Sequence, residues 1–144
     1  MLRFVCCASL ALSGSVAGCG TGFLRDVALD GPYRLVAVDH PEDMLLCRSV
    51  GTEGDCLGDG LAGGATVFQA GANAKFIVVA RHPRRWPEAA DRSISEFYYV
   101  IRSASEPDPL APLTVVGPMN KLEYDKESER LGLPDFTKIF EDLK

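Results

Sequence analysis

The N-terminal segment constrains the fold most, because its composition sets it apart from everything that follows. Arg3 is the only charged residue before Cys19, and residues 4–17 form a stretch of apolar and small residues. A short positive start, an uncharged apolar stretch and small residues before a cleavage point are typical of a secretory signal. The stretch is too short for a comfortable membrane span, which needs about 20 apolar residues. We therefore expect residues 1–18 to be a signal peptide outside the folded domain.

The end of this segment, Val16-Ala17-Gly18-Cys19, resembles the lipobox of bacterial lipoproteins. In that class the cysteine thiol receives a diacylglyceryl group, the signal is cleaved just before the cysteine, and the new amino group is acylated, as with palmitate. The resemblance implies that Cys19 is a lipidated N-terminus, and several acyl chains make a firm anchor where one is marginal. Gly20 is not the aspartate that retains some lipoproteins at the inner membrane, which favours the outer membrane facing the periplasm. The alternatives are an ordinary signal with a chance cysteine, or a short uncleaved anchor.

Length and charge bound what the mature chain can be. Removing 18 of the 144 residues leaves enough chain for one modest domain with a single core. We expect residues 19–31 to form a tether and residues 32–144 a single domain. The formal net charge of −5 includes Arg3, so the mature chain would carry −5 − 1 = −6. This acidity argues against nucleic acid as a partner and against electrostatic binding to anionic lipid. The protein would therefore be held at the membrane through the lipid on Cys19.

The cysteines left after cleavage predict a disulfide. Cys6 and Cys7 leave with the signal, which leaves Cys47 and Cys56 as an even pair in an oxidising compartment. A metal site would need more ligands at short spacing, and a redox motif would need two cysteines separated by two residues. We therefore interpret the pair as structural.

The mature chain predicts an antiparallel β-rich domain, because turn residues separate short runs of β-branched and aromatic residues. The expected strands are Tyr33–Val38, Met44–Arg48, Ala65–Gln69, Lys75–Arg81, Phe97–Ile101 and Leu113–Val116. Lys75–Arg81 would form a hairpin with the strand before it, and Phe76–Ala80 is apolar on both faces, as in a central strand with Phe97–Ile101 beside it. The expected fold class is α+β: a single antiparallel sheet of five to six strands with C-terminal helices packed on it.

Helix signals agree best near the C-terminus. Asn120 with Glu123 forms a capping box, and Gly132 followed by Pro134 stops a helix, which predicts a helix over Lys121–Leu131. After Asp135, apolar residues recur with helical spacing. This pattern predicts a second amphipathic turn and a half on the sheet, formed by Phe136, Ile139, Phe140 and Leu143.

These C-terminal motifs also carry a resemblance. Gly117-Pro118-Met119-Asn120, Glu123-Tyr124 and Leu131-Gly132-Leu133-Pro134 resemble the closing signature of a family of small bacterial lipoproteins of unknown function. Phe76–Ala80 and Phe97–Ile101 look like the two strands that precede this signature in the family. The chain departs from the pattern around Cys47 and Cys56 and in the loop after His82. Because the family has no assigned activity, the resemblance implies a fold and a location but no catalytic residue.

A tryptophan among arginines is the most prominent surface candidate. Trp86, the only tryptophan, lies in a polar stretch with Arg84 and Arg85, and Arg81 and Arg92 are close by in the sequence. An exposed tryptophan beside arginines is typical of a protein-contact hot spot, so Trp86, Arg84 and Arg85 are candidate partner contacts. The alternative is that Trp86 tucks under its loop as a satellite core residue while the arginines offset local acidity. The sequence favours this alternative.

No motif predicts catalysis, a metal site or a cofactor. His40 and His82 each precede a proline in an expected loop, and neither a nucleophile elbow nor a phosphate-binding loop is present. We therefore expect a lipid-anchored protein of the bacterial envelope, not an enzyme, that acts as a protein-binding or structural module. The alternative is an inhibitor or immunity-type protein that neutralises a toxin or a cell-wall hydrolase. An enzyme would need His40 or His82 in a deep pocket beside carboxylates.

Overall fold

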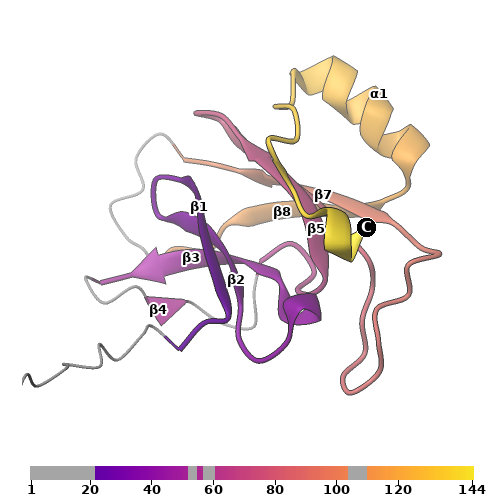
Figure 1. Cartoon of the computed structure of the whole chain (residues 1–144). Helices are drawn as coiled ribbons and strands as arrows, with labels where there is room; N and C mark the ends of the chain where they lie inside the picture. The colour runs from indigo at the N-terminus through magenta and orange to yellow at the C-terminus, as the bar shows by residue number, and fades with distance from the viewer. Residues whose placement is uncertain (1–21, 52–54, 57–60, 104–109) are drawn as a thin grey trace, which may run out of the picture.

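The computed structural model describes residues 22–51, 55–56, 61–103 and 110–144. The predicted signal peptide, residues 1–18, and the predicted lipidation site, Cys19, lie outside these residues. Over the described ranges the chain forms two antiparallel sheets and one α-helix (Figure 1). No helix within those ranges is long and apolar enough to cross a membrane.

The N-terminal part of the domain forms the first sheet. Its strands, paired in the order β1-β2-β3-β4, are β1 (Arg25–Asp30), β2 (Tyr33–Ala37), β3 (Leu45–Val50) and β4 (Asp55–Cys56). A short 3₁₀-helix, η1 (Pro41–Asp43), connects β2 to β3. The predicted tether over residues 19–31 is wrong for residues 25–30, which form β1. The reason is a two-residue alternation, in which Val27 and Leu29 pack half-buried against the core and their neighbours face solvent.

The remaining strands form the second sheet. In the order β8-β7-β6-β5-β9, its strands are β8 (Thr114–Met119), β7 (Glu96–Ile101), β6 (Phe76–Arg81), β5 (Val67–Ala72) and β9 (Lys138–Ile139). The prediction of β6 as a central strand beside β7 is confirmed, since Ile77 to Ala80 are fully buried. β5 and β6 form the predicted hairpin. At its turn, the side-chain oxygen of Asn73 accepts hydrogen bonds from the amides of Lys75 (2.9 Å) and Phe76 (2.8 Å).

The expectation of a single sheet is wrong, because the two sheets pair separately and share one hydrophobic core. Tyr33 and Leu35 of β2 are fully buried in this core, as are Ile77 and Val79 of β6. The amide of Val67 also donates a 2.8 Å hydrogen bond to the carbonyl of Met44, which joins the start of β5 to the first sheet. A pattern of apolar residues identifies strands but does not say which strands pair. The observed arrangement of two antiparallel sheets and one helix fits the α+β class.

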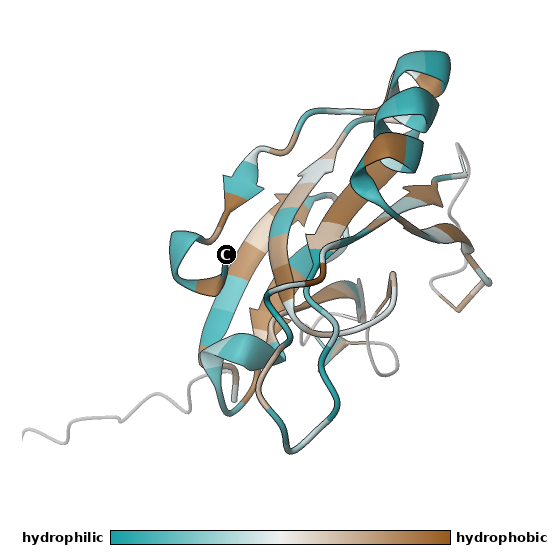
Figure 2. Cartoon of the chain, turned by 90° about the vertical axis from the view of Figure 1, so that its right-hand side faces the viewer, coloured by the Kyte–Doolittle hydropathy of each residue, from teal (hydrophilic) through white to brown (hydrophobic). Residues whose placement is uncertain are grey.

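The predicted helix Lys121–Leu131 is confirmed as α1. Asn120 Oδ1 accepts the amide of Glu123 at 2.9 Å and Glu123 Oε2 accepts the amide of Asn120 at 2.8 Å, which is the predicted capping box. Gly132 ends the helix with a left-handed φ of 66°. The helix packs through Tyr124, whose ring stacks on Phe97 of β7 with centroids 5.0 Å apart. Figure 2 shows that α1 is mostly hydrophilic, whereas the strands of the second sheet are largely hydrophobic.

The predicted second helix after Asp135 is wrong. This segment forms β9 and a short 3₁₀-helix, η2 (Glu141–Leu143), and runs along the edge of β5. The amides of Thr137 and Phe140 donate to β5 carbonyls, both at 2.9 Å. The open edge of β5 supplies the backbone hydrogen-bond partners that a helix would have supplied within the segment. Of the four apolar residues that predicted the helix, only Leu143 is fully buried. Gly71 permits this approach, since a Cβ there would lie 1.9 Å from the carbonyl oxygen of Asp135.

Gly117-Pro118-Met119, part of the motif that carries the family resemblance, lies within β8. Gly117 has a φ of +138°, and a Cβ there would lie 2.5 Å from Tyr98 Cδ1. The pairing of β7 with β8 shifts register at this point. Glycine is required because the strand passes against the ring of Tyr98.

The predicted disulfide between Cys47 and Cys56 is present. It joins β3 to β4, and the two Cα atoms lie 5.4 Å apart. Ser49 pairs with Cys56 in the short β3–β4 ladder. A bond that closes a loop of this size holds the two-residue strand β4 against β3.

We predict that Gly71→Ala destabilises the domain, because the added methyl group would collide with the backbone of Asp135 and push β9 from the edge of β5. The expected cost is about 2 kcal/mol or more, seen as a fall in Tm on the order of 10 °C. Gly22→Ala is the matched control, since nothing lies within 4 Å of a Cβ at Gly22. Equal Tm values for the two variants would contradict the close approach of the C-terminal segment.

We predict that the double variant Cys47→Ala/Cys56→Ala is less stable by about 2.7 kcal/mol, the chain-entropy value for closing a loop of about ten residues. Urea denaturation of the oxidised wild type and the double variant measures the difference. A reductant should lower the stability of the wild type and leave the variant unchanged. Free thiols at both positions in the non-reduced protein, detected by alkylation and mass spectrometry, would refute the disulfide.

Candidate functional site

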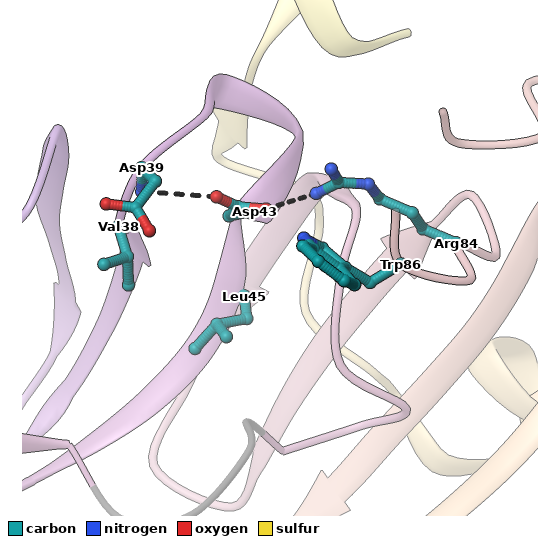
Figure 3. Close-up of a pocket in the computed structure, with 7 residues that line it drawn as sticks. Val38, Asp39, Asp43, Leu45, Arg84 and Trp86 are labelled. Atoms are coloured by element: carbon teal, nitrogen blue, oxygen red, sulfur yellow. Dashed lines mark hydrogen bonds and ion pairs between the residues drawn. The ribbon is translucent and has the colours of Figure 1, made fainter. Parts of the chain in front are cut away.

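An open pocket lies between the end of β2, η1, the start of β3 and the loop that joins β6 to β7. Its volume is about 510 Å³, which falls within the range of small-ligand sites. Figure 3 shows Arg84 and Trp86 approaching from the β6–β7 loop on one side and the η1 region on the other. The lining residues are Val38, Asp39, Asp43, Leu45, Ala65, Arg84 and Trp86.

The β6–β7 loop, residues 82–95, is held rigidly enough to present Trp86 outward. His82 pairs with Thr66 through two backbone hydrogen bonds of 2.9 Å, which extend the β5–β6 ladder into the loop. The amide of Asp91 donates to the carbonyl of Pro83 at 2.9 Å and closes the loop. A turn follows Arg85, whose carbonyl accepts the amide of Glu88 at 2.8 Å. Trp86 lies at this turn, away from the core.

Ion pairs join the loop to η1. Arg84 Nη1 donates a short hydrogen bond to Asp43 Oδ1, and Arg84 Nε lies 4.0 Å from Glu42 Oε2. Glu42 also accepts from Arg92 Nη2 at 3.3 Å and from the amide of Ala90 at 3.1 Å. We call Glu42, Asp43, Arg84 and Arg92 the η1–loop network. The side chain of Arg84 is only 10% exposed, so its charge is largely removed from water and neutralised by the two carboxylates.

The network keeps both carboxylates ionised. The amide hydrogen bond from Ala90 lowers the pKa of Glu42; burial opposes it, and Arg92 and Arg84 lower it further. Burial alone would raise the pKa of Asp43, but hydrogen bonds from Arg84 and from the amides of His40 and Asp39 outweigh it and lower the pKa. Glu42 and Asp43 are therefore both negatively charged near neutral pH.

The three candidate partner contacts differ in exposure: Trp86 and Arg85 are exposed, whereas Arg84 is largely buried. Trp86 is 79% exposed, so the interpretation that it tucks under its loop is wrong. Arg85 is exposed as well, and its side chain makes no ion pair with any described residue. It lines a neighbouring cavity of about 320 Å³. Arg84 is committed to the η1–loop network. The reason is that Glu42 and Asp43, about 40 positions away in the sequence, lie beside Arg84 only after folding.

The side chains of both histidines interact with backbone groups. His40 caps η1, where its Nδ1 accepts the amide of Glu42 at 3.1 Å. His82 is buried, stacks on Phe68 with centroids 4.3 Å apart, and its Nδ1 lies 2.7 Å from the carbonyl of Ile94. Neither lines the pocket, so the arrangement that an enzyme hypothesis would need is not formed there.

Sequence reasoning missed the acidic side of the pocket. Glu42 and Asp43 follow Pro41 directly in the sequence, and the structure pairs them with Arg84 and Arg92. The available signal was Pro41 followed by two acidic residues, which is typical of the first turn of a helix. Among the described residues, no group of three or more His, Cys, Asp or Glu side chains could hold a metal ion.

Comparison with protein-family models, with curated proteins and with solved structures finds no match to the chain. The similarity to a family of small lipoproteins therefore stays a prediction that depends on the quoted motifs.

We predict that Arg84→Met destabilises the domain by about 1–3 kcal/mol at pH 7, because it leaves Asp43 half-buried without its cation and leaves Glu42 with Arg92 alone. Arg85→Met is the matched control and should change stability by less than about 0.5 kcal/mol. Urea denaturation measures both differences.

The difference between wild type and Arg84→Met should also depend on pH. Folding lowers the pKa of Glu42 and of Asp43. The stability that these carboxylates contribute is therefore present above their unfolded-state pKa values of about 4 and is lost as the pH falls through the lower folded-state values. Denaturation at pH 7 and pH 3 should show the difference shrinking, and a constant difference would contradict the ion pairs.

Proposed function

We propose that the protein is a non-catalytic binding or structural module that is held at the bacterial cell envelope by lipid on Cys19. The lipobox-like Val16–Cys19 supports the anchor, as does the disulfide between Cys47 and Cys56, which suits an oxidising compartment outside the cytoplasm. In this proposal residues 1–18 are removed as a signal peptide. The outer membrane, with the domain facing the periplasm, is the proposed location.

The observation that carries the non-catalytic part of the proposal is how the pocket uses its polar groups. Asp43 and Arg84 neutralise each other across the pocket wall, and both histidines are bound to backbone groups elsewhere. General acid–base or nucleophilic catalysis combines a titratable group that is free to exchange a proton with a second group that activates or orients it. Asp39, the lining carboxylate outside this ion pair, has no histidine, cysteine or second unpaired carboxylate among the lining residues. An open pocket with an exposed tryptophan at its rim is better suited to contact with another surface.

The proposed role is to hold a protein partner at the envelope. Chemical cross-linking in cells, followed by co-purification of the wild type and of Cys19→Ser, tests it. A partner captured only by the anchored form would support the proposal. If that partner were a toxin or a cell-wall hydrolase, the inhibitor or immunity-type function would replace it. Failure of both forms to capture a protein would contradict a protein-binding role.

We predict that Cys19→Ser moves the protein from the membrane fraction to the soluble fraction and abolishes incorporation of labelled palmitate, since the thiol is the proposed site of lipid attachment. Cys6→Ser is the matched control, because it alters a cysteine of the same segment that is not proposed to carry lipid. It should fractionate and label as the wild type does. Membrane retention of Cys19→Ser would refute the anchor.

A further inference from the structure

We propose that an exposed patch formed by Leu24, Val38, Arg85 and Trp86 rests on the headgroup region of the bilayer to which Cys19 is attached. This inference depends on the proposed lipid anchor and says which end of the domain faces the membrane. The apolar members are exposed, with exposed fractions of 55% for Leu24, 42% for Val38 and 79% for Trp86. We call these four residues the entry patch.

The entry patch lies where the chain enters the domain. The amide of Leu24 donates to the carbonyls of Ala37 (2.7 Å) and Val38 (3.2 Å), which places the chain just before β1 beside the end of β2. Val38 in turn lines the same pocket as Trp86 (Figure 3). Figure 1 shows the start of β1 and the β6–β7 loop toward the same end, with α1 at the far end. The point of entry and the exposed tryptophan therefore share one end of the molecule.

The short connection to Cys19 limits how the domain can be oriented. Five residue steps separate Cys19 from Leu24, and a fully extended chain spans at most about 18 Å over five steps. A domain of just over 100 residues has a radius of gyration of about 13 Å, which corresponds to a diameter of about 34 Å. Because the connection is shorter than the domain, the end at which the chain enters has to stay near the bilayer. Because β1 begins at Arg25, the connection is shorter than the predicted tether over residues 19–31.

The chemistry of the entry patch suits the interface between lipid and water. Tryptophan concentrates at headgroup level because its ring is largely apolar while its indole N–H needs a polar partner. The exposed side chain of Arg85 can place its guanidinium among lipid phosphates while its stem covers apolar surface. Asp43 and Arg84 neutralise each other in the wall of the pocket beside Trp86, and Arg85 lines the neighbouring cavity together with Glu88 and Asp91.

A protein partner is the competing occupant of the entry patch, because exposed tryptophan is also typical of protein contacts. The position of the entry patch beside the lipid anchor favours the bilayer over a protein partner. A patch that is held by a short connection beside its own lipid meets the membrane at very high effective concentration, whereas a protein has to displace it.

Fluorescence of Trp86 tests the proposal directly, because Trp86 is the only tryptophan in the chain. The lipidated full-length protein would be reconstituted into phosphatidylcholine vesicles, with and without lipids brominated on the acyl chains. We expect a blue-shifted emission, quenching by brominated lipid of at least twofold, and reduced quenching by acrylamide, all relative to the unlipidated Cys19→Ser protein. A second reporter, Trp86→Phe combined with Leu122→Trp on α1, should be quenched by acrylamide and not by brominated lipid, since Leu122 is 66% exposed on α1.

Vesicle flotation separates the two proposals. If the wild type floats with vesicles but Trp86 is quenched by acrylamide and not by brominated lipid, the anchor stands and the proposed orientation is overturned. The patch would then face water and be open to a protein. If the wild type does not float, the anchor fails and the orientation, which depends on it, fails with it. Equal quenching of both reporters by brominated lipid would also overturn the proposal, because it would show no preferred face.

Discussion

Strand β6 is buried on both faces, so other parts of the chain have to pack against each face of the second sheet. On one face Val78 and Ala80 lie opposite Tyr99 and Phe97 of β7, and Phe97 stacks on Tyr124 of α1. On the other face Ile77 and Val79 lie opposite Val100 and Tyr98, and their side chains belong to the core that is shared with the first sheet. A strand that is apolar on both faces needs a packed layer on each face to exclude water. The helix forms one of these layers and the first sheet forms the other.

The pocket depends on a second constraint, which is electrostatic. Glu42 and Asp43 on η1 and Arg84 and Arg92 on the β6–β7 loop come from opposite sides of the pocket, and each is partly removed from water. Arg92 also donates to the carbonyls of Asp142 (3.2 Å) and Lys144 (3.1 Å), so the same loop holds the C-terminus. Arg84 is held by two carboxylates, and the turn that follows it is closed by the amide of Glu88 on the carbonyl of Arg85, with the side chains of Arg85 and Trp86 exposed to solvent. The pairing of Arg84 thus holds the start of the turn that exposes Trp86.

These constraints give the molecule two different ends. One end carries the start of β1, the pocket and Trp86, and the other carries α1 with its capping box and its hydrophilic surface (Figures 1 and 2). Arg25, the first residue of β1, forms an ion pair with Asp142 at 2.6 Å, so the C-terminus also lies near the point of entry. In the proposed orientation, with the anchor at the end where the chain enters, the surface around α1 is directed away from the membrane. A protein partner in the envelope would have that surface available to it.

The sequence by itself determined what local chemistry controls. The capped helix Lys121–Leu131, the hairpin at Asn73, the central strand Phe76–Ala80 and the Cys47–Cys56 disulfide could all be predicted, because each depends on residues near one another or on a single composition rule. Tertiary structure decided the rest. Division of the strands into two sheets depended on long-range pairing, and the edge of β5 turned the predicted second helix into β9 by offering it hydrogen bonds. The exposure of Trp86 was likewise decided by tertiary structure, because an ion pair gains energy only when its partners are adjacent, and the carboxylates that hold Arg84 are brought beside it by folding alone.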